Sequence, residues 1–117
     1  MKVIIVDDEK PGLDNLQFYL SKMESVEILG LYQDPLKALQ SVVEKRPDAV
    51  FLDISMPEMN GLQVASEILK FDDGIKIVFA TAFDDYAVKA FELNAIDYVL
   101  KPYSFNRVEM AVNRIKK

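Results

Sequence analysis

The sequence predicts a doubly wound α/β fold in which five parallel strands alternate with five helices. Five short apolar runs, rich in β-branched residues, are typical of strands covered on both faces. Between these runs apolar residues recur at helical spacing, and the connections are short. This strict alternation indicates a parallel sheet between two helical layers, joined by right-handed crossovers. The expected strands span residues 3–6, 26–31, 49–52, 75–80 and 96–100.

The first three helices have recognisable starts. Pro11 suits the first turn of a helix after the first strand, and Asp34-Pro35 forms an N-cap followed by a first helical residue. After the third strand the Met56-Pro57 step forces a turn, and Asn60 is the expected N-cap of the third helix. The residues expected to face the core are Leu13, Leu16, Leu20 and Met23 in the first helix, Leu36, Leu39 and Val43 in the second, and Leu62, Ala65, Ile68 and Leu69 in the third.

The last two helices follow the fourth and fifth strands in the same way. Asp84 or Asp85 is expected to cap the fourth helix, and Ser104 to cap the fifth. The residues expected to face the core are Ala87, Ala90 and Phe91 in the fourth helix, and Phe105, Val108, Val112 and Ile115 in the fifth.

Composition excludes several classes of function. The 117 residues fit one domain, and the absence of cysteine and histidine excludes thiol chemistry, disulfides and histidine-based catalysis. The net charge of −5 argues against a basic nucleic-acid-binding face. No apolar run approaches the roughly 20 residues needed to span a bilayer. The apolar run near the N-terminus is too short for a signal peptide. We therefore expect a soluble, cytoplasmic chain.

Polar residues gather where the strands end. Asp7 and Asp8 follow the first strand, Asp53 the third, Thr81 the fourth and Lys101 the fifth. In a doubly wound sheet, ligands bind beyond the carboxyl ends of the strands, where the strand order reverses. In the flavodoxin-like order 2-1-3-4-5 the first and third strands are neighbours, so the three carboxylates would lie close together.

Such a cluster of carboxylates needs a counter-charge. At an effective dielectric near 20, each like-charged pair 4 Å apart costs roughly 4 kcal/mol. With only oxygen ligands available, the expected cation is Mg²⁺. Lys101 would add a second positive charge, and Thr81 a hydroxyl donor. A metal, an ammonium and a hydroxyl around one carboxylate oxygen are the groups that in-line phosphoryl transfer to Asp53 requires.

The chain resembles, from end to end, a CheY-like response-regulator receiver domain of bacterial two-component signalling. The resemblance rests on the motifs Asp7-Asp8, Leu52-Asp53, Met56-Pro57 with Gly61, Thr81-Ala82 and Lys101-Pro102, each at the expected strand end. The segments 83–92 and 96–102 also resemble receivers attached to LytTR-type DNA-binding domains.

The resemblance implies a role for each residue of the acidic site. Asp53 would be the phosphoacceptor, and Mg²⁺ would be bound by Asp8 and Asp53, by the backbone carbonyl of Ser55, and by Asp7 through a water molecule. Thr81 and Lys101 would bind the transferred phosphoryl group, and Tyr98 would be the aromatic switch residue. The residues with a structural role would be Pro57, Gly61 and Pro102, the last of them after a cis peptide bond.

The implied function is a phosphorylation-dependent signalling switch rather than an enzyme acting on an external substrate. A histidine kinase would donate the phosphoryl group, and the surface formed by the fourth helix, fifth strand and fifth helix would change shape, with homodimerisation through that surface. Residues 1–117 would form one receiver domain that binds no DNA itself. A DNA-binding output domain beyond Lys117 would act on transcription.

Two other functions remain open from the sequence. One is a Mg²⁺-dependent phosphatase or phosphotransferase of the haloacid dehalogenase type, whose members expect a second Asp two residues after the nucleophile, where this chain has Ser55. The other is a stand-alone interaction module that is independent of phosphate. Such modules usually lack at least one of the residues at the strand ends, and here all are present.

Overall fold

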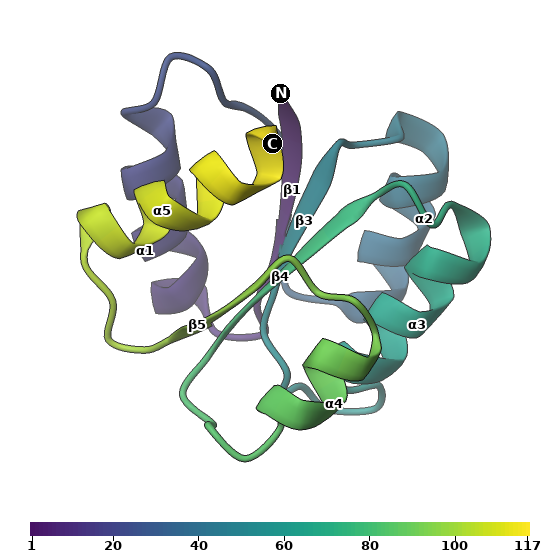
Figure 1. Cartoon of the computed structure of the whole chain (residues 1–117). Coiled ribbons are helices and arrows are strands. Elements are labelled where there is room, and N and C mark those ends of the chain that lie inside the picture. Colours follow the sequence, from purple (N-terminus) through teal and green to yellow (C-terminus); the bar gives the residue numbers. More distant parts are fainter.

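The computed structural model describes all 117 residues and contains one five-stranded parallel sheet in the order β2-β1-β3-β4-β5 (Figure 1). The predicted fold class and strand order are therefore confirmed. The strands are β1 (Lys2–Val6), β2 (Glu27–Tyr32), β3 (Ala49–Leu52), β4 (Lys76–Thr81) and β5 (Asp97–Leu100). Three of them begin one residue later than expected, because the ladders with neighbouring strands start at Glu27, Lys76 and Asp97 and not at the apolar residue before each.

Helices cover both faces of the sheet. Helices α1 and α5 lie on one face, and α2, α3 and α4 on the other (Figure 1). Their bounds are α1 (Lys10–Ser21), α2 (Pro35–Lys45), α3 (Gly61–Phe71), α4 (Ala87–Glu92) and α5 (Phe105–Lys116). None of these helices combines the length and apolar character needed to span a membrane.

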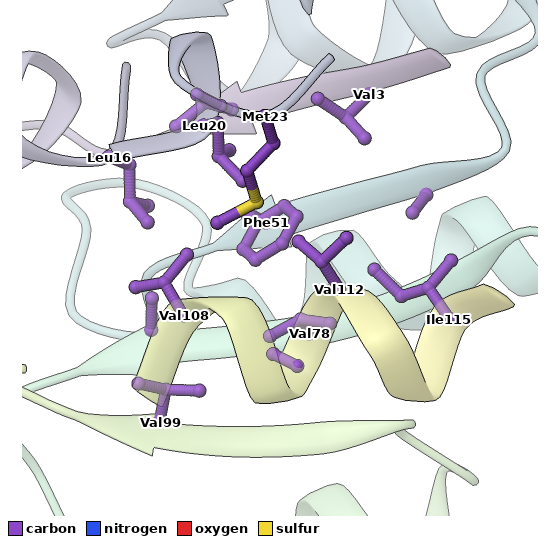
Figure 2. Packing of buried hydrophobic residues seen from close by; sticks show 14 of the residues in the cluster. Val3, Leu16, Leu20, Met23, Phe51, Val78, Val99, Val108, Val112 and Ile115 are labelled. Carbon is purple, nitrogen blue, oxygen red and sulfur yellow. The ribbon is translucent and has the colours of Figure 1, made fainter. Parts of the chain in front are cut away.

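Each face of the sheet has its own hydrophobic core. On the α1/α5 side, Phe51 lies between Met23 and Val112, surrounded by leucines of α1 and valines of the strands (Figure 2). On the other side Phe79 and Ile4 pack with α2 and α3. Burying a large aliphatic or aromatic side chain stabilises the fold by about 1.5–3 kcal/mol. The two cores together hold the sheet in a fixed position between its helices.

The predicted caps are confirmed for three helices. The side chain of Asp34 accepts a hydrogen bond from the N–H of Leu36 at 2.9 Å. Asn60 accepts from the N–H of Gln63 at 3.0 Å, and the Gln63 side chain accepts from the N–H of Asn60, which completes a capping box. Ser104 Oγ accepts from the N–H of Arg107 at 3.1 Å. These caps fix where α2, α3 and α5 begin.

The prediction for α4 was wrong in two respects. Neither Asp84 nor Asp85 caps it, since the N-cap position is Tyr86 and no side chain bonds there. Of the three residues expected inside, only Ala90 is buried, whereas Ala87 is exposed and Phe91 is 81% exposed. A helix of only six residues presents little more than one position to the sheet, and Ala90 takes it.

The buried face of α2 also differs from the prediction. Leu36 and Val43 are largely exposed, and Leu39 is half-buried. The helix begins at Pro35, and the positions that face the sheet are Pro35, Ala38, Ser41 and Val42. Neighbouring positions differ by about 100° around a helix, so Leu36 and Val43 point away from the core. In α1, α3 and α5 the expected residues are buried or half-buried.

Candidate functional site

The acidic residues meet because of the register between β1 and β3. Val6 pairs with Leu52 in the parallel ladder, so Asp7 and Asp53 each continue past the same edge of the sheet. The N–H of Asp53 donates to the carbonyl of Val6 at 3.0 Å, which fixes the two chains at this point. The predicted proximity of the two strand ends is confirmed.

The three carboxylates form one cluster. Oxygens of Asp7, Asp8 and Asp53 all lie within 4.8 Å of one another. Oδ1 of Asp8 is buried and has no hydrogen-bond partner, although a buried polar atom is nearly always paired. An unpaired carboxylate oxygen beside two others is the donor set that a hard divalent cation uses. The residues at this position therefore fit Mg²⁺.

Lys101 supplies a positive charge on one side of the cluster. Its Nζ lies 2.7 Å from Oδ2 of Asp7 and 3.2 Å from Oδ2 of Asp53. Burial alone would lower the pKa of Lys101, but the hydrogen bond to Asp7 and the charges of Asp53 and Asp7 outweigh it and raise the pKa. Lys101 follows β5, and the Lys101-Pro102 peptide bond is cis.

Burial raises the pKa values of Asp7 and Asp8. Burial raises the pKa of Asp7 above its ordinary value, against the lowering effect of the hydrogen bonds from Lys101 and from the backbone N–H of Glu9. Burial and then repulsion from Asp53 and Glu9 raise the pKa of Asp8. Both shifts express the cost of placing like charges together in partly desolvated surroundings.

The acceptor oxygens of Asp53 are held from two sides. Oδ1 accepts hydrogen bonds from the backbone N–H of Ile54 at 2.7 Å and from that of Ser55 at 3.4 Å, and Oδ2 faces Lys101. The side chain of Ser55 is exposed. Pro57 lies in the turn beyond it, where its carbonyl accepts a hydrogen bond from the N–H of Met59 at 2.7 Å.

Gly61 allows the turn to close against Asp53. A Cβ atom at position 61 would lie 2.1 Å from the carbonyl oxygen of Asp53 and 2.8 Å from Cα of Ile54. The N–H of Gly61 donates to the carbonyl of Ile54 at 2.8 Å. Only a residue without a Cβ permits this close approach, so Gly61 contributes to the position of the Asp53 backbone.

Thr81, whose carbonyl accepts a hydrogen bond from the N–H of Lys101 at 2.8 Å, is joined to Tyr98 through Phe83. The N–H of Phe83 donates to Oγ1 of Thr81 at 3.3 Å, and the hydroxyl of Tyr98 donates to the carbonyl of Phe83. Thr81 is fully buried, whereas Tyr98 is half-buried with its ring against Phe79. In this arrangement the Thr81 hydroxyl bonds to its own loop and not to a carboxylate.

Two site residues were missed by the sequence reasoning. Gly12 of α1 lies so close to Asp7 that an added Cβ would be 2.0 Å from Oδ2. Tyr103 lines a cavity of about 510 Å³ with Gly12 and Lys101, and its buried hydroxyl has no partner. Burial raises the pKa of Tyr103 to about 12. No sequence motif marks either residue, although both stand within a few positions of residues predicted to form the site.

Comparison with known proteins gives one consistent result. The sequence model of the response regulator receiver domain matches residues 3–113. The chain is 41% identical over all 117 residues to sensory transduction protein LytT of Bacillus cereus, and 42% identical to transcriptional regulatory protein BtsR of Salmonella typhi. It covers 48% of each, so the chain spans about half the length of the curated relatives it matches.

A solved structure of the same kind is similar along the whole chain. The response regulatory domain of protein mrkE from Klebsiella pneumoniae superimposes with a TM-score of 0.92 and 39% sequence identity, over 99% of this chain and 95% of that one. The similarity covers all five strands and all five helices.

Proposed function

The chain belongs to the response regulator receiver family, and we propose from this premise that Asp53 accepts a phosphoryl group from a histidine kinase. The observation that carries the proposal is the surroundings of Asp53. One of its oxygens is held by backbone N–H groups, the other faces Lys101, and a carboxylate oxygen of Asp8 nearby has no partner. Receivers act in phosphorylation-dependent signalling, and this site has the groups that such a transfer needs.

Receiver domains generally bind Mg²⁺ in an acidic pocket, and we assign that role here to four residues. Asp8 and Asp53 would bind the ion directly, together with the backbone carbonyl of Ser55, and Asp7 would bind through water. Both oxygens of Asp7 already accept hydrogen bonds, from Lys101 and from the N–H of Glu9, which suits a residue that does not bind directly. When bound, Mg²⁺ supplies positive charge against the oxygens of the incoming phosphoryl group.

The transfer itself needs only a carboxylate oxygen and charge stabilisation. An Asp53 oxygen forms a bond to phosphorus while the bond from phosphorus to the donor histidine nitrogen breaks. Lys101 already lies 3.2 Å from Oδ2 of Asp53 and is positioned to pair with the new phosphoryl oxygens. The Thr81 hydroxyl, which accepts a hydrogen bond from the Phe83 N–H, would donate its own hydrogen to a phosphoryl oxygen.

Movement of Thr81 toward the phosphoryl group would give the site a means of signalling. Because Phe83 joins Thr81 to Tyr98, movement of Thr81 removes one contact that holds the loop and frees Tyr98 to turn inward. The surface of α4, β5 and α5 then changes shape as a two-state equilibrium. That surface exposes apolar side chains at Val88, Phe91, Leu100 and Met110, and we propose that phosphorylation leads to homodimerisation through it.

We further propose that residues 1–117 form one receiver domain, and that an output domain which binds DNA follows it in the whole protein. The length of the curated relatives supports this, as does the name of BtsR as a transcriptional regulatory protein. The receiver would not bind nucleic acid itself, in line with its net charge of −5. It would work in the cytoplasm, where its kinase presents the phosphoryl group.

The domain would catalyse only its own phosphorylation and dephosphorylation. A haloacid dehalogenase-like phosphatase would need a carboxylate two residues after Asp53, and Ser55 there has an exposed hydroxyl. A module independent of phosphate would have no use for the buried pair between Lys101 and Asp7. Both alternatives therefore explain less of the site than the receiver does.

The proposal is tested by intact-mass measurement after incubation with acetyl phosphate and Mg²⁺. One phosphoryl group is expected on the wild-type protein and none on Asp53→Asn. Asp84→Asn is the matched control, because Asp84 is an exposed acid of the neighbouring β4–α4 loop. Undiminished labelling of Asp53→Asn would refute the assignment.

A further inference from the structure

A buried carboxylate outside the acidic site joins β5 to α5. Asp97, the first residue of β5, is only 7% exposed. Arg107 donates from Nη1 to Oδ2 at 2.8 Å and from Nη2 to Oδ1 at 2.7 Å. Nη1 of Arg114 lies 2.8 Å from Oδ1. Both arginines belong to α5, so Asp97 fastens this helix to the edge strand.

The same groups hold the backbone of Tyr98. Its N–H donates to Oδ1 of Asp97 at 2.7 Å, and its carbonyl accepts from Nη2 of Arg107 at 3.2 Å. Strand β5 is the last strand of the sheet and pairs only with β4. Asp97 and Arg107 thus bind the N–H and the carbonyl of Tyr98, as a neighbouring strand would.

The side chain of Tyr98 reaches the loop that follows β4. Its hydroxyl donates to the carbonyl of Phe83, whose N–H donates to Oγ1 of Thr81 at 3.3 Å. Hydrogen bonds at the two ends of Phe83 and of Tyr98, joined by the covalent bonds of these residues, therefore link Thr81 to Asp97. Because two arginines of α5 bind Asp97, this path connects the end of β4 with that helix.

The chemistry of the connection suits transmission of a movement. A buried ion pair is often no more stabilising than apolar residues of the same size, so stability alone gives little reason for a charge at position 97. The guanidinium fork of Arg107 binds the carboxylate through two parallel hydrogen bonds, which fix direction as well as distance. Arg114, half-exposed, adds a second ion pair to Asp97 from about two turns further along α5.

We propose that Asp97 is a positioning residue that makes α5 follow the rearrangement of Thr81 and Tyr98. The inference rests on the proposed function, since it takes phosphorylation of Asp53 as the event that moves Thr81. The peptide groups of Tyr98 bind the carboxylate of Asp97 and the fork of Arg107, so a shift of β5 that accompanies the turn of the Tyr98 ring is passed to α5. Without that carboxylate, Tyr98 still rearranges but α5 no longer responds.

The test places a reporter on α5. The chain has no cysteine, so Asn113→Cys gives a single attachment site for a fluorophore. Asn113 is an exposed residue of α5 that lines a hollow with Lys22 and Met23, away from the apolar residues of the proposed dimer surface. The change in fluorescence is measured on addition of beryllofluoride with Mg²⁺, and labelling of Asp53 by acetyl phosphate is measured separately by intact mass.

Two variants and a control are compared in the Asn113→Cys protein. Asp97→Asn keeps the shape of the side chain and removes its charge. Arg114→Gln removes one partner from a half-exposed position, so the protein keeps the Arg107 fork and its fold. Asp14→Asn is the control, because Asp14 pairs with Lys10 on the exposed face of α1.

We expect the fluorescence response of Asp97→Asn to fall about tenfold, which is the size of a typical coupling between two sites of a protein. The response of Arg114→Gln should fall by an intermediate amount. Labelling of Asp53 should stay within about twofold of the control in both variants. Normal labelling with an unchanged fluorescence response in both variants would overturn the inference alone. Failure of acetyl phosphate to label the parent protein would overturn the proposed function, and the inference with it.

Discussion

Replacing Asp8 by asparagine is expected to stabilise the metal-free protein. Asp8 shares the cluster in which carboxylate oxygens lie within 4.8 Å of one another, and Lys101 pairs with Asp7 and Asp53 but not with Asp8. At an effective dielectric near 20, each like-charged pair at that distance costs about 3.5 kcal/mol. Asp8 is partly exposed, so solvent and salt screen much of this repulsion.

We therefore expect Asp8→Asn to raise the free energy of unfolding by about 1–2 kcal/mol in the absence of Mg²⁺, or roughly 4–10 °C in melting temperature. With Mg²⁺ this difference should shrink. At ten times its dissociation constant, an ion that binds only the folded state adds about 1.4 kcal/mol to the wild-type protein. Asp8→Asn should gain much less, because its amide replaces the carboxylate with the unpaired oxygen.

The measurement is urea unfolding followed by circular dichroism, with a chelator and then with increasing Mg²⁺. Asp73→Asn is the matched control, since Asp73 is an exposed acid between α3 and β4. Two results would refute the reasoning: a less stable Asp8→Asn protein in chelator, or equal stabilisation of both proteins by Mg²⁺. The first would mean that Asp8 is held by contacts other than a cation, and the second that the ion binds elsewhere.

Three further predictions concern the surroundings of the site. Gly61→Ala should destabilise the protein by about 1–3 kcal/mol, because the added Cβ would lie 2.1 Å from the carbonyl oxygen of Asp53. The urea midpoint measures this, with Gly74→Ala as the control. An unchanged midpoint would contradict the prediction. For Asp97, burial alone would raise the pKa, but hydrogen bonds from Arg107 and Tyr98 and the charges of both arginines lower it. Its contribution to stability is therefore full above about pH 4 and lost as pH falls further. The stability difference between wild type and Asp97→Asn should accordingly shrink as the pH falls below about 4, and a constant difference would count against this. Phe91 is 81% exposed, so Phe91→Ser should keep the free energy of unfolding within about 0.5 kcal/mol of the wild-type value and abolish dimerisation in beryllofluoride. Dimerisation is measured by light scattering, with Phe18→Ser on α1 as the control. A wild-type protein that stays monomeric in beryllofluoride would exclude this dimer.

The sequence predicts the parts of this fold that depend on local signals. Strand positions and the caps at Asp34, Asn60 and Ser104 follow from residues within a few positions of each other, and all are confirmed. The strand order then brings together residues far apart in the sequence, including Lys101 and Asp7, which are 94 positions apart. Parallel strands that end at one edge of a sheet are sufficient to predict this proximity.

What the sequence does not predict depends on tertiary packing. Phe91 has the spacing of a core residue, but α4 is too short to turn that face toward the sheet. No local signal predicts a role for Asp97, because its partners stand ten and seventeen positions later on another element. Gly12 is constrained by the side chain of Asp7, and no rule of helix propensity reveals such an approach.

The charges of the site show why phosphorylation can act as a switch. Three carboxylates and one ammonium leave two negative charges, which a bound Mg²⁺ would balance. Conversion of the Asp53 carboxylate to an acyl phosphate dianion adds one further negative charge at the same place. Two donors of the chain can meet it: Lys101, which now pairs with Asp7 and Asp53, and Thr81, whose hydroxyl accepts from the Phe83 N–H and keeps its own hydrogen free to donate. The added charge therefore draws both donors toward Asp53, and the hydrogen bond between Phe83 and Tyr98 joins the loop after Thr81 to β5.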